Sequence, residues 1–163
     1  AQRPVFSRDG RWIYFSSNRG GIRNMWKVPV KGGPMVQLTR NGGFRGEEST
    51  DGTTLYFTAA PAGEGVWAIP LKGGDGDGRK LFGPLVSADA FQVFDDGIYA
   101  VMRTPPKGGA SLVFYSFSSR QIRPVENLDS SFEGRISISA DRRWLVYDAL
   151  RLRSGDLMMM EGL

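Results

Sequence analysis

The stretch SRDGRWIYFSSNRGG, residues 7–21, returns in altered form within the same chain of 163 residues. Residues 49–63 read STDGTTLYFTAAPAG and residues 139–155 read SADRRWLVYDALRLRSG, while residues 94–105, FDDGIYAVMRTP, are a shortened relative. The four turn aspartates follow one another at spacings of 42, 45 and 45 residues: Asp9, Asp51, Asp96 and Asp141. A period of roughly 40–45 residues is typical of four-stranded propeller blades. The repeat therefore predicts an all-β fold, a β-propeller.

The first copy shows how each repeat builds a four-stranded sheet. The dipeptide Asp9-Gly10 favours a tight hairpin turn, because both residues tolerate a positive φ. Residues 12–15 are apolar on both faces, as expected of a strand sandwiched between sheets. Pro29 suits a strand end, since proline cannot donate to a ladder. We expect strands at residues 4–7, 12–15, 24–28 and 36–39, then 48–49, 54–58, 66–69 and 79–82, a third set within 91–125, and finally 135–139, 144–147 and 156–160.

The repeat divides the chain into four predicted blades of antiparallel sheet. Their bounds are approximately residues 1–43, 44–86, 87–130 and 131–163, and the last blade lacks its fourth strand. Propellers commonly complete their final blade with a strand from the N-terminus of the protein. We therefore expect the chain to be the C-terminal part of a ring of roughly six to eight blades.

The composition of the chain limits which catalytic, metal-binding and partner-binding functions it can have. The chain contains no cysteine and no histidine, which excludes disulfides, thiol catalysis, Ser-His-Asp triads and zinc sites built from His or Cys. The formal net charge is +4, but arginine is spread along the chain without a basic stripe, so we predict no nucleic-acid binding by this segment. No window approaches the roughly 18 apolar residues of a membrane span, and we predict no membrane insertion.

Two segments of the first repeat carry a family resemblance. PVFSRDGRWIYFSSNRGG (residues 4–21) and MWKVPVKGGPMVQLT (residues 25–39) resemble the WD-like repeat of bacterial TolB-type β-propellers. The shared pattern is a strand, Ser-x-Asp-Gly, an aromatic-rich strand ending in Ser-Asn-Arg, another strand, Gly-Gly and Gln-Leu-Thr. The resemblance covers essentially the whole chain and is weakest in the third repeat.

A finer resemblance rests on three later stretches: residues 96–103, 113–125 and 136–163. They are similar to the C-terminal propellers of large bacterial proteins that begin with a winged-helix DNA-binding domain (CadC-like regulators) or a protein-kinase domain. This likeness implies a sensory module in a periplasmic or otherwise extracytoplasmic location. Two features depart from the pattern: Arg142 stands at the turn glycine, and the hairpin of the third repeat is two residues short.

Motifs for catalysis or metal binding are weak. Glu47 and Glu48 are adjacent on a strand, so their side chains point to opposite faces and cannot act as a two-acid pair; they could instead line the central channel. Residues 73–78, GGDGDG, resemble the start of a calcium loop, but the twelfth position counted from Asp75 is Val86 instead of an acid. We interpret this segment as a turn and predict no metal site and no cofactor. The run Met158–Met160 and the four tryptophans are interpreted as core.

The candidate binding residues lie in the loops that would share one face of a propeller, at the mouth of the channel. Function commonly sits on loops that a rigid scaffold carries. From the first two repeats the candidates are Asn18, Arg19, Arg23, Asn41, Phe44, Arg45, Glu47 and Glu48. Their equivalents in later repeats are Arg103, Glu133 and Arg135. The alternative is that these are solvated loop residues without a partner.

Three functions remain open at this point. The favoured one is a non-catalytic module that binds a protein partner or a small ligand at the channel mouth. The second is an enzyme, or an accessory propeller of a peptidase or lyase; the chain has no histidine and no nucleophile elbow, so we predict no activity of its own. The third is a structural half-ring whose open sides join a second copy, giving a homodimer that closes the ring. Fold alone does not decide among them.

Overall fold

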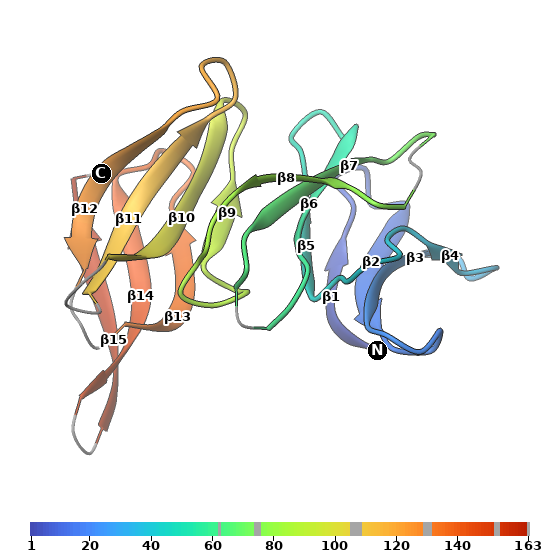
Figure 1. Ribbon diagram of the computed structural model, residues 1–163, viewed down its shortest axis with the longest axis horizontal. Helices are drawn as coiled ribbons and strands as arrows, with labels where there is room; N and C mark the ends of the chain where they lie inside the picture. Colours follow the sequence, from blue (N-terminus) through green and yellow to red (C-terminus); the bar gives the residue numbers. More distant parts are fainter. Residues whose placement is uncertain (62, 74–75, 105–108, 129–131, 152–153, 163) are drawn as a thin grey trace. The chain divides into compact units, whose positions relative to one another are not determined.

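The computed structural model describes residues 1–61, 63–73, 76–104, 109–128, 132–151 and 154–162. Within these residues, fifteen β-strands form four antiparallel sheets (Figure 1). The chain divides into two compact units, Ala1–Gly83 and Pro84–Leu163, each of which contains two sheets. In every sheet the strands neighbour one another in chain order, as successive hairpins require.

Unit 1 contains two four-stranded sheets. The first consists of β1 (Gln2–Phe6), β2 (Trp12–Ser17), β3 (Asn24–Pro29) and β4 (Val36–Gln37). The second consists of β5 (Arg45–Glu48), β6 (Thr54–Thr58), β7 (Val66–Pro70) and β8 (Arg79–Phe82). The buried side chains that join the two sheets come from both: Tyr14, Met25, Leu55, Phe57 and Ile69. Each sheet thus covers one apolar face of the other.

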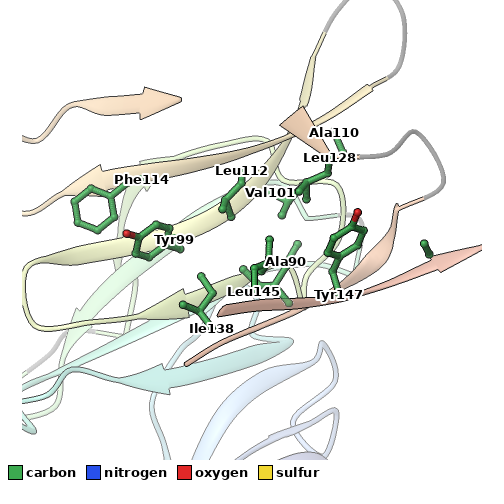
Figure 2. Packing of buried hydrophobic residues seen from close by; sticks show 12 residues of the cluster. Ala90, Tyr99, Val101, Ala110, Leu112, Phe114, Leu128, Ile138, Leu145 and Tyr147 are labelled. Carbon is green, nitrogen blue, oxygen red and sulfur yellow. The ribbon is translucent and has the colours of Figure 1, made fainter. Parts of the chain in front are cut away.

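Unit 2 contains one sheet of four strands and one of three. The first consists of β9 (Phe91–Val93), β10 (Gly97–Thr104), β11 (Gly109–Ser116) and β12 (Ile122–Leu128). The second consists of β13 (Phe132–Ile138), β14 (Trp144–Arg151) and β15 (Ser154–Glu161). Figure 2 shows the cluster between them, in which Tyr99, Val101 and Leu112 of the first sheet meet Ile138, Leu145 and Tyr147 of the second.

The prediction of four antiparallel sheets, the last with three strands, is confirmed. β6 and β8 begin and end at the predicted residues, whereas β4 is shorter than expected. The backbone N–H groups of Leu38 and Thr39 both bond the carbonyl of Met25, over 2.8 and 3.4 Å. Two donors on one acceptor break the ladder, so regular pairing ends at Gln37.

Three repeats build the same turn between their first two strands. In the first repeat, Ser7 Oγ donates to Asp9 Oδ1 over 2.7 Å and accepts from the backbone N–H of Trp12 over 2.9 Å. The same two bonds measure 2.6 and 3.0 Å in both of the other copies, Ser49–Asp51–Thr54 and Ser139–Asp141–Trp144. The spacing of serine and aspartate is therefore a local hydrogen-bonding device, and this explains why it repeats.

The two departures from the repeat contact each other. Arg142 adopts a φ of 60°, close to the 68° of its equivalent Gly10, although it carries a side chain. Its guanidinium lies 4.7 Å from the centre of the Phe94 ring and bonds Asp95 over 2.7 Å and Asp96 over 2.6 Å. These two aspartates form the shortened hairpin of the third repeat. The backbone strain at Arg142 is thus accompanied by contacts that a glycine could not make.

Candidate functional site

The loop between β4 and β5 places Phe44 at the edge of unit 1. The backbone N–H of Phe44 donates to the carbonyl of Thr58 over 2.7 Å. The preceding residue must be glycine, because a Cβ atom at Gly43 would clash with the backbone nitrogen of Met25. The loop is therefore packed closely against β3, and Phe44 is half-buried in a fixed position.

Two arginines flank the Phe44 ring. The guanidinium carbon of Arg3 lies 4.1 Å from the ring centre and that of Arg23 lies 5.5 Å from it. Arg23 Nη1 also donates to Gln2 Oε1 over 2.8 Å, which connects the β2–β3 loop with β1. Cation–π pairs of this kind contribute about 0.5–1 kcal/mol each at exposed sites. The result is a surface with positive charge over an aromatic ring, here named the Arg–Phe cluster: Gln2, Arg3, Arg23 and Phe44.

Arg45 and Glu47 continue this surface along β5. They alternate with Gly46 and Glu48 and so face the same side of the sheet. Arg45 Nη2 lies 3.3 Å from Glu47 Oε2, and their side chains are 25% and 19% exposed. The ion pair thus lies at a largely covered position.

Glu48 points to the opposite face, where it joins the two sheets of unit 1. Its side chain is 7% exposed and accepts a 2.9 Å hydrogen bond from the Tyr14 hydroxyl. The backbone N–H of Arg8 donates to its other carboxylate oxygen. Burial, together with the bond to the carboxylate, raises the pKa of Tyr14 well above its usual value. Glu48 is therefore a buried structural acceptor and does not lie on an open loop surface.

Three further candidates of unit 1 make their described contacts elsewhere. The Asn18 carbonyl accepts from the Gly21 N–H over 3.0 Å and closes the β2–β3 turn. The Arg19 guanidinium lies 5.3 Å from the ring centres of both Phe15 and Trp26, on the outer face of the first sheet. Asn41 Nδ2 donates to Asp77 Oδ1 over 2.8 Å.

Among the described residues of unit 2, the candidates Arg103 and Arg135 lie on different strands. Arg103 is exposed near the end of β10. Arg135 is exposed on β13, and its backbone N–H donates to Asp148 Oδ1 over 2.7 Å. The side chain of Glu133 lies outside the described residues, as does Asp75 of the calcium-like segment.

Sequence reasoning missed Gln2 and Arg3. Both precede Pro4, where the first strand was expected to begin, but β1 starts at Gln2. One signal was present: Arg3 and Arg45 stand 42 residues apart, which is one period of the repeat. The structure breaks this equivalence: an irregularity in β1, where Arg3 has a φ of 52°, places Gln2 opposite Ser16, whereas Arg45 itself lies opposite Thr58, one period later.

A second polar surface lies at the other end of the two sheets in unit 1. It is a hollow of about 760 Å³, which the β1–β2 and β5–β6 turns line together with the candidate Glu48, Thr54, Pro70 and Lys72. Its acids already have partners within the chain. Asp9 bonds Ser7 and Arg11, and Asp51 bonds Ser49 and Thr53, through the contacts that build the two turns.

Among the described residues, no group of three or more acidic side chains is placed to hold a metal ion. No helix in the described part of the chain is long and apolar enough to cross a bilayer.

The fold of this chain is similar to that of known β-propellers. No protein-family model matches the chain. The crystal structure of TolB from Acinetobacter baumannii superposes with a TM-score of 0.76, at 18% identity, over 97% of this chain and 40% of that one. The chain has a TolB-like β-propeller fold. Its four sheets are propeller blades, the last with three strands, and they span well under two thirds of the larger propeller.

Two further similar proteins have names that indicate different activities. Oligogalacturonate lyase from Vibrio parahaemolyticus superposes with a TM-score of 0.64, at 14% identity, over 91% of this chain and 45% of that one. In sequence, 98 residues are 37% identical to a Streptomyces coelicolor protein that is named as a tricorn protease homologue. That match covers 53% of this chain and 8% of the relative. Similarity at these levels shows the fold and leaves the activity open.

Proposed function

We propose that this chain is a non-catalytic propeller module that binds a protein partner through the Arg–Phe cluster and the adjoining Arg45–Glu47 pair. The observation that carries the proposal is the Phe44 ring flanked by the guanidiniums of Arg3 and Arg23. Arginine and aromatic side chains are enriched where protein interfaces gain most of their binding energy. Phe44 is held by a packed loop and therefore loses little freedom on binding.

A protein partner suits this surface better than a small ligand. The cluster lies on half-exposed strand ends and loops, whereas the 760 Å³ hollow is lined by other residues. Small-molecule sites are usually concave and enclose most of the ligand. The guanidiniums favour a partner that presents carboxylates to them.

The proposal also covers the larger protein to which this propeller belongs. The resemblance to propellers linked to CadC-like regulators or kinases supports a sensory part of a larger extracytoplasmic protein. A second candidate, an accessory propeller of a peptidase, is favoured by the similarity to the protein named as a tricorn protease homologue. In both settings, the propeller itself binds and carries out no chemistry.

The first test compares captured proteins between variants of the tagged full chain. Arg23→Glu reverses one guanidinium and Phe44→Ala removes the ring, while Lys31→Glu changes an exposed turn residue with the same charge reversal as the first variant. Quantitative mass spectrometry of bacterial extracts should show at least one protein that binds wild type and Lys31→Glu and is depleted at least tenfold with both cluster variants. Glu48 stays unchanged because it is buried.

Identical captured sets for all four proteins would contradict the proposal, provided that the variants melt within a few degrees of wild type. Arg23→Glu keeps the test decisive if the loss of the Phe44 ring lowers stability. Turnover of peptide or oligosaccharide substrates by the purified chain would favour an enzyme instead.

A further inference from the structure

The hollow between the β1–β2 and β5–β6 turns takes no part in the proposed function. Its volume of about 760 Å³ falls within the roughly 300–1,000 Å³ of small-molecule sites. All of its lining residues belong to unit 1, and they come from both sheets of that unit. Six of them are charged, three of each sign: Arg8, Arg11, Lys72, Asp9, Glu48 and Asp51. The hollow thus has the size of a ligand site, and its hydrogen-bonding groups decide what it can hold.

The three acids of the hollow already serve the fold as hydrogen-bond acceptors. The Glu48 carboxylate accepts from the Tyr14 hydroxyl over 2.9 Å and, through its other oxygen, from the backbone N–H of Arg8. Asp9 and Asp51 each accept from the serine two residues earlier and from the backbone N–H two residues later. All three carboxylates therefore have donors within the chain itself.

Two cations of the hollow have no such partner among the residues that the structure describes. Arg8 bonds Glu48 through its backbone, and its guanidinium takes part in no hydrogen bond or ion pair there. The ammonium of Lys72 has no described partner either, and both side chains are exposed. A guanidinium and an ammonium together carry eight N–H donors. The hollow is therefore suited to a ligand with negative charge and many acceptor oxygens.

The two unpaired cations belong to different sheets. Arg8 follows β1 in the turn to β2, and Lys72 follows β7. The backbone bond from Arg8 to Glu48 holds the β1–β2 turn against the second sheet, so the packing of unit 1 sets where both side chains begin. A ligand with two anionic groups gives each of these cations a partner.

We propose that this hollow binds a small molecule that carries two oxyanion groups, carboxylates or phosphates, with Arg8 and Lys72 each holding one of them. Guanidinium and ammonium groups form charge-assisted hydrogen bonds with the oxygens of both kinds of anion. The Thr50 hydroxyl, which has no hydrogen bond within the described residues, adds an uncharged donor to the lining. This site lies at the other end of the sheets from the Arg–Phe cluster and is independent of partner binding there.

The test is a titration of the full isotope-labelled chain, in which nuclear magnetic resonance follows the backbone amide signals at constant ionic strength. The probes are citrate, which carries several carboxylates, inorganic pyrophosphate, and glucose as an uncharged control. At least one of the two anions should shift the signals of residues 8–11, 50–54 and 72 in a saturable way. We expect half-saturation at about 1 mM or below, because two charge-assisted contacts form. Glucose should leave these signals unchanged.

Arg8→Gln and Lys72→Gln should each raise the half-saturating concentration at least about fivefold, because each removes one cation from the hollow. Both variants should keep the fold, since the two side chains are exposed and the backbone bond of residue 8 remains. Lys31→Gln is the matched control. Lys31 occupies the same place in the Lys-Gly-Gly turn of the first repeat, 41 residues earlier, and does not line the hollow. This variant should bind as wild type does.

An absence of saturation with both anions up to about 20 mM would overturn the proposal. Unchanged binding in both variants would do so as well, and so would an equal loss with Lys31→Gln, which would show an effect of net charge alone. A loss confined to one of the two variants would contradict the contact with two anionic groups. Tighter binding of citrate would indicate a ligand with carboxylates, and tighter binding of pyrophosphate one with phosphates.

Discussion

At the scale of single residues, this chain uses polar groups to join its sheets. Tyr14 and Glu48 meet across 34 positions of sequence, and both are almost fully buried. A buried acceptor that loses its donor keeps the cost of its desolvation. Removing one partner of such a pair therefore costs more stability than the net energy of the hydrogen bond suggests. Tyr99 occupies the equivalent position in unit 2, but there the facing residue is Ile138.

Tyr14→Phe should lower the free energy of unfolding by about 1–3 kcal/mol, because it leaves the Glu48 carboxylate with one donor fewer. Tyr99→Phe is the control: no hydrogen bond joins its hydroxyl to the described residues, and we expect a change below about 0.5 kcal/mol. Urea denaturation of both variants provides the measurement. Equal losses in the two variants would mean that the hydroxyl of Tyr14 contributes nothing beyond its volume.

At the scale of the element, the Ser-x-Asp turn is the unit that repeats. The hydrogen bond from Ser7, followed by the backbone and side chain of Arg11, lowers the pKa of Asp9 to about 2. Serine bonds come first among the causes that lower the pKa of Asp51 and Asp141 as well. A carboxylate whose pKa is lower in the folded state stabilises the fold above its unfolded value of 3.8, and this contribution disappears as the pH falls toward 2.

The triple variant Asp9→Asn, Asp51→Asn, Asp141→Asn should therefore melt below wild type at pH 6, and the difference should shrink steadily between pH 4 and pH 2. Thermal unfolding followed by circular dichroism at intervals of one pH unit measures it. A constant difference across this range would show that the turns gain nothing from the charge of their aspartates.

At the scale of the whole molecule, the chain consists of two compact units, each with its own core between two sheets. Gly43 lies where the β4–β5 loop presses on the backbone of Met25 in unit 1. Leu112 is fully buried in the core of unit 2. Substitutions at these two positions should act on different parts of the chain.

Gly43→Ala should destabilise unit 1 by at least about 1–3 kcal/mol through overpacking, and Leu112→Ala should destabilise unit 2 by about 2–5 kcal/mol through the cavity that it leaves. Hydrogen exchange followed by mass spectrometry should show lost protection within residues 1–83 for the first variant and within residues 84–163 for the second. Uniform loss across the chain in both variants would instead indicate a single cooperative core.

The sequence by itself determined the repeat, the class of fold and most strand positions. Turns such as Asp9-Gly10 and strands such as Trp12–Ser17 depend on neighbouring residues, so a short stretch contains the information that specifies them. The expectation of four antiparallel sheets followed from these local turn and strand patterns. The end of β4 could not be predicted in this way, because it depends on a carbonyl of β3.

Only the tertiary structure decided which side chains meet. Arg142 and the Asp95–Asp96 hairpin each looked like an isolated departure in the sequence, yet they bond across 46 and 47 positions. Glu48 was predicted on the surface and is buried under Tyr14, while Arg3, absent from the candidates, lies over Phe44. Such contacts form between neighbouring sheets, where packing brings together residues that are 34 to 47 positions apart in the sequence. The periodic pattern fixes the scaffold, and the side chains that differ between its copies determine what each face can bind.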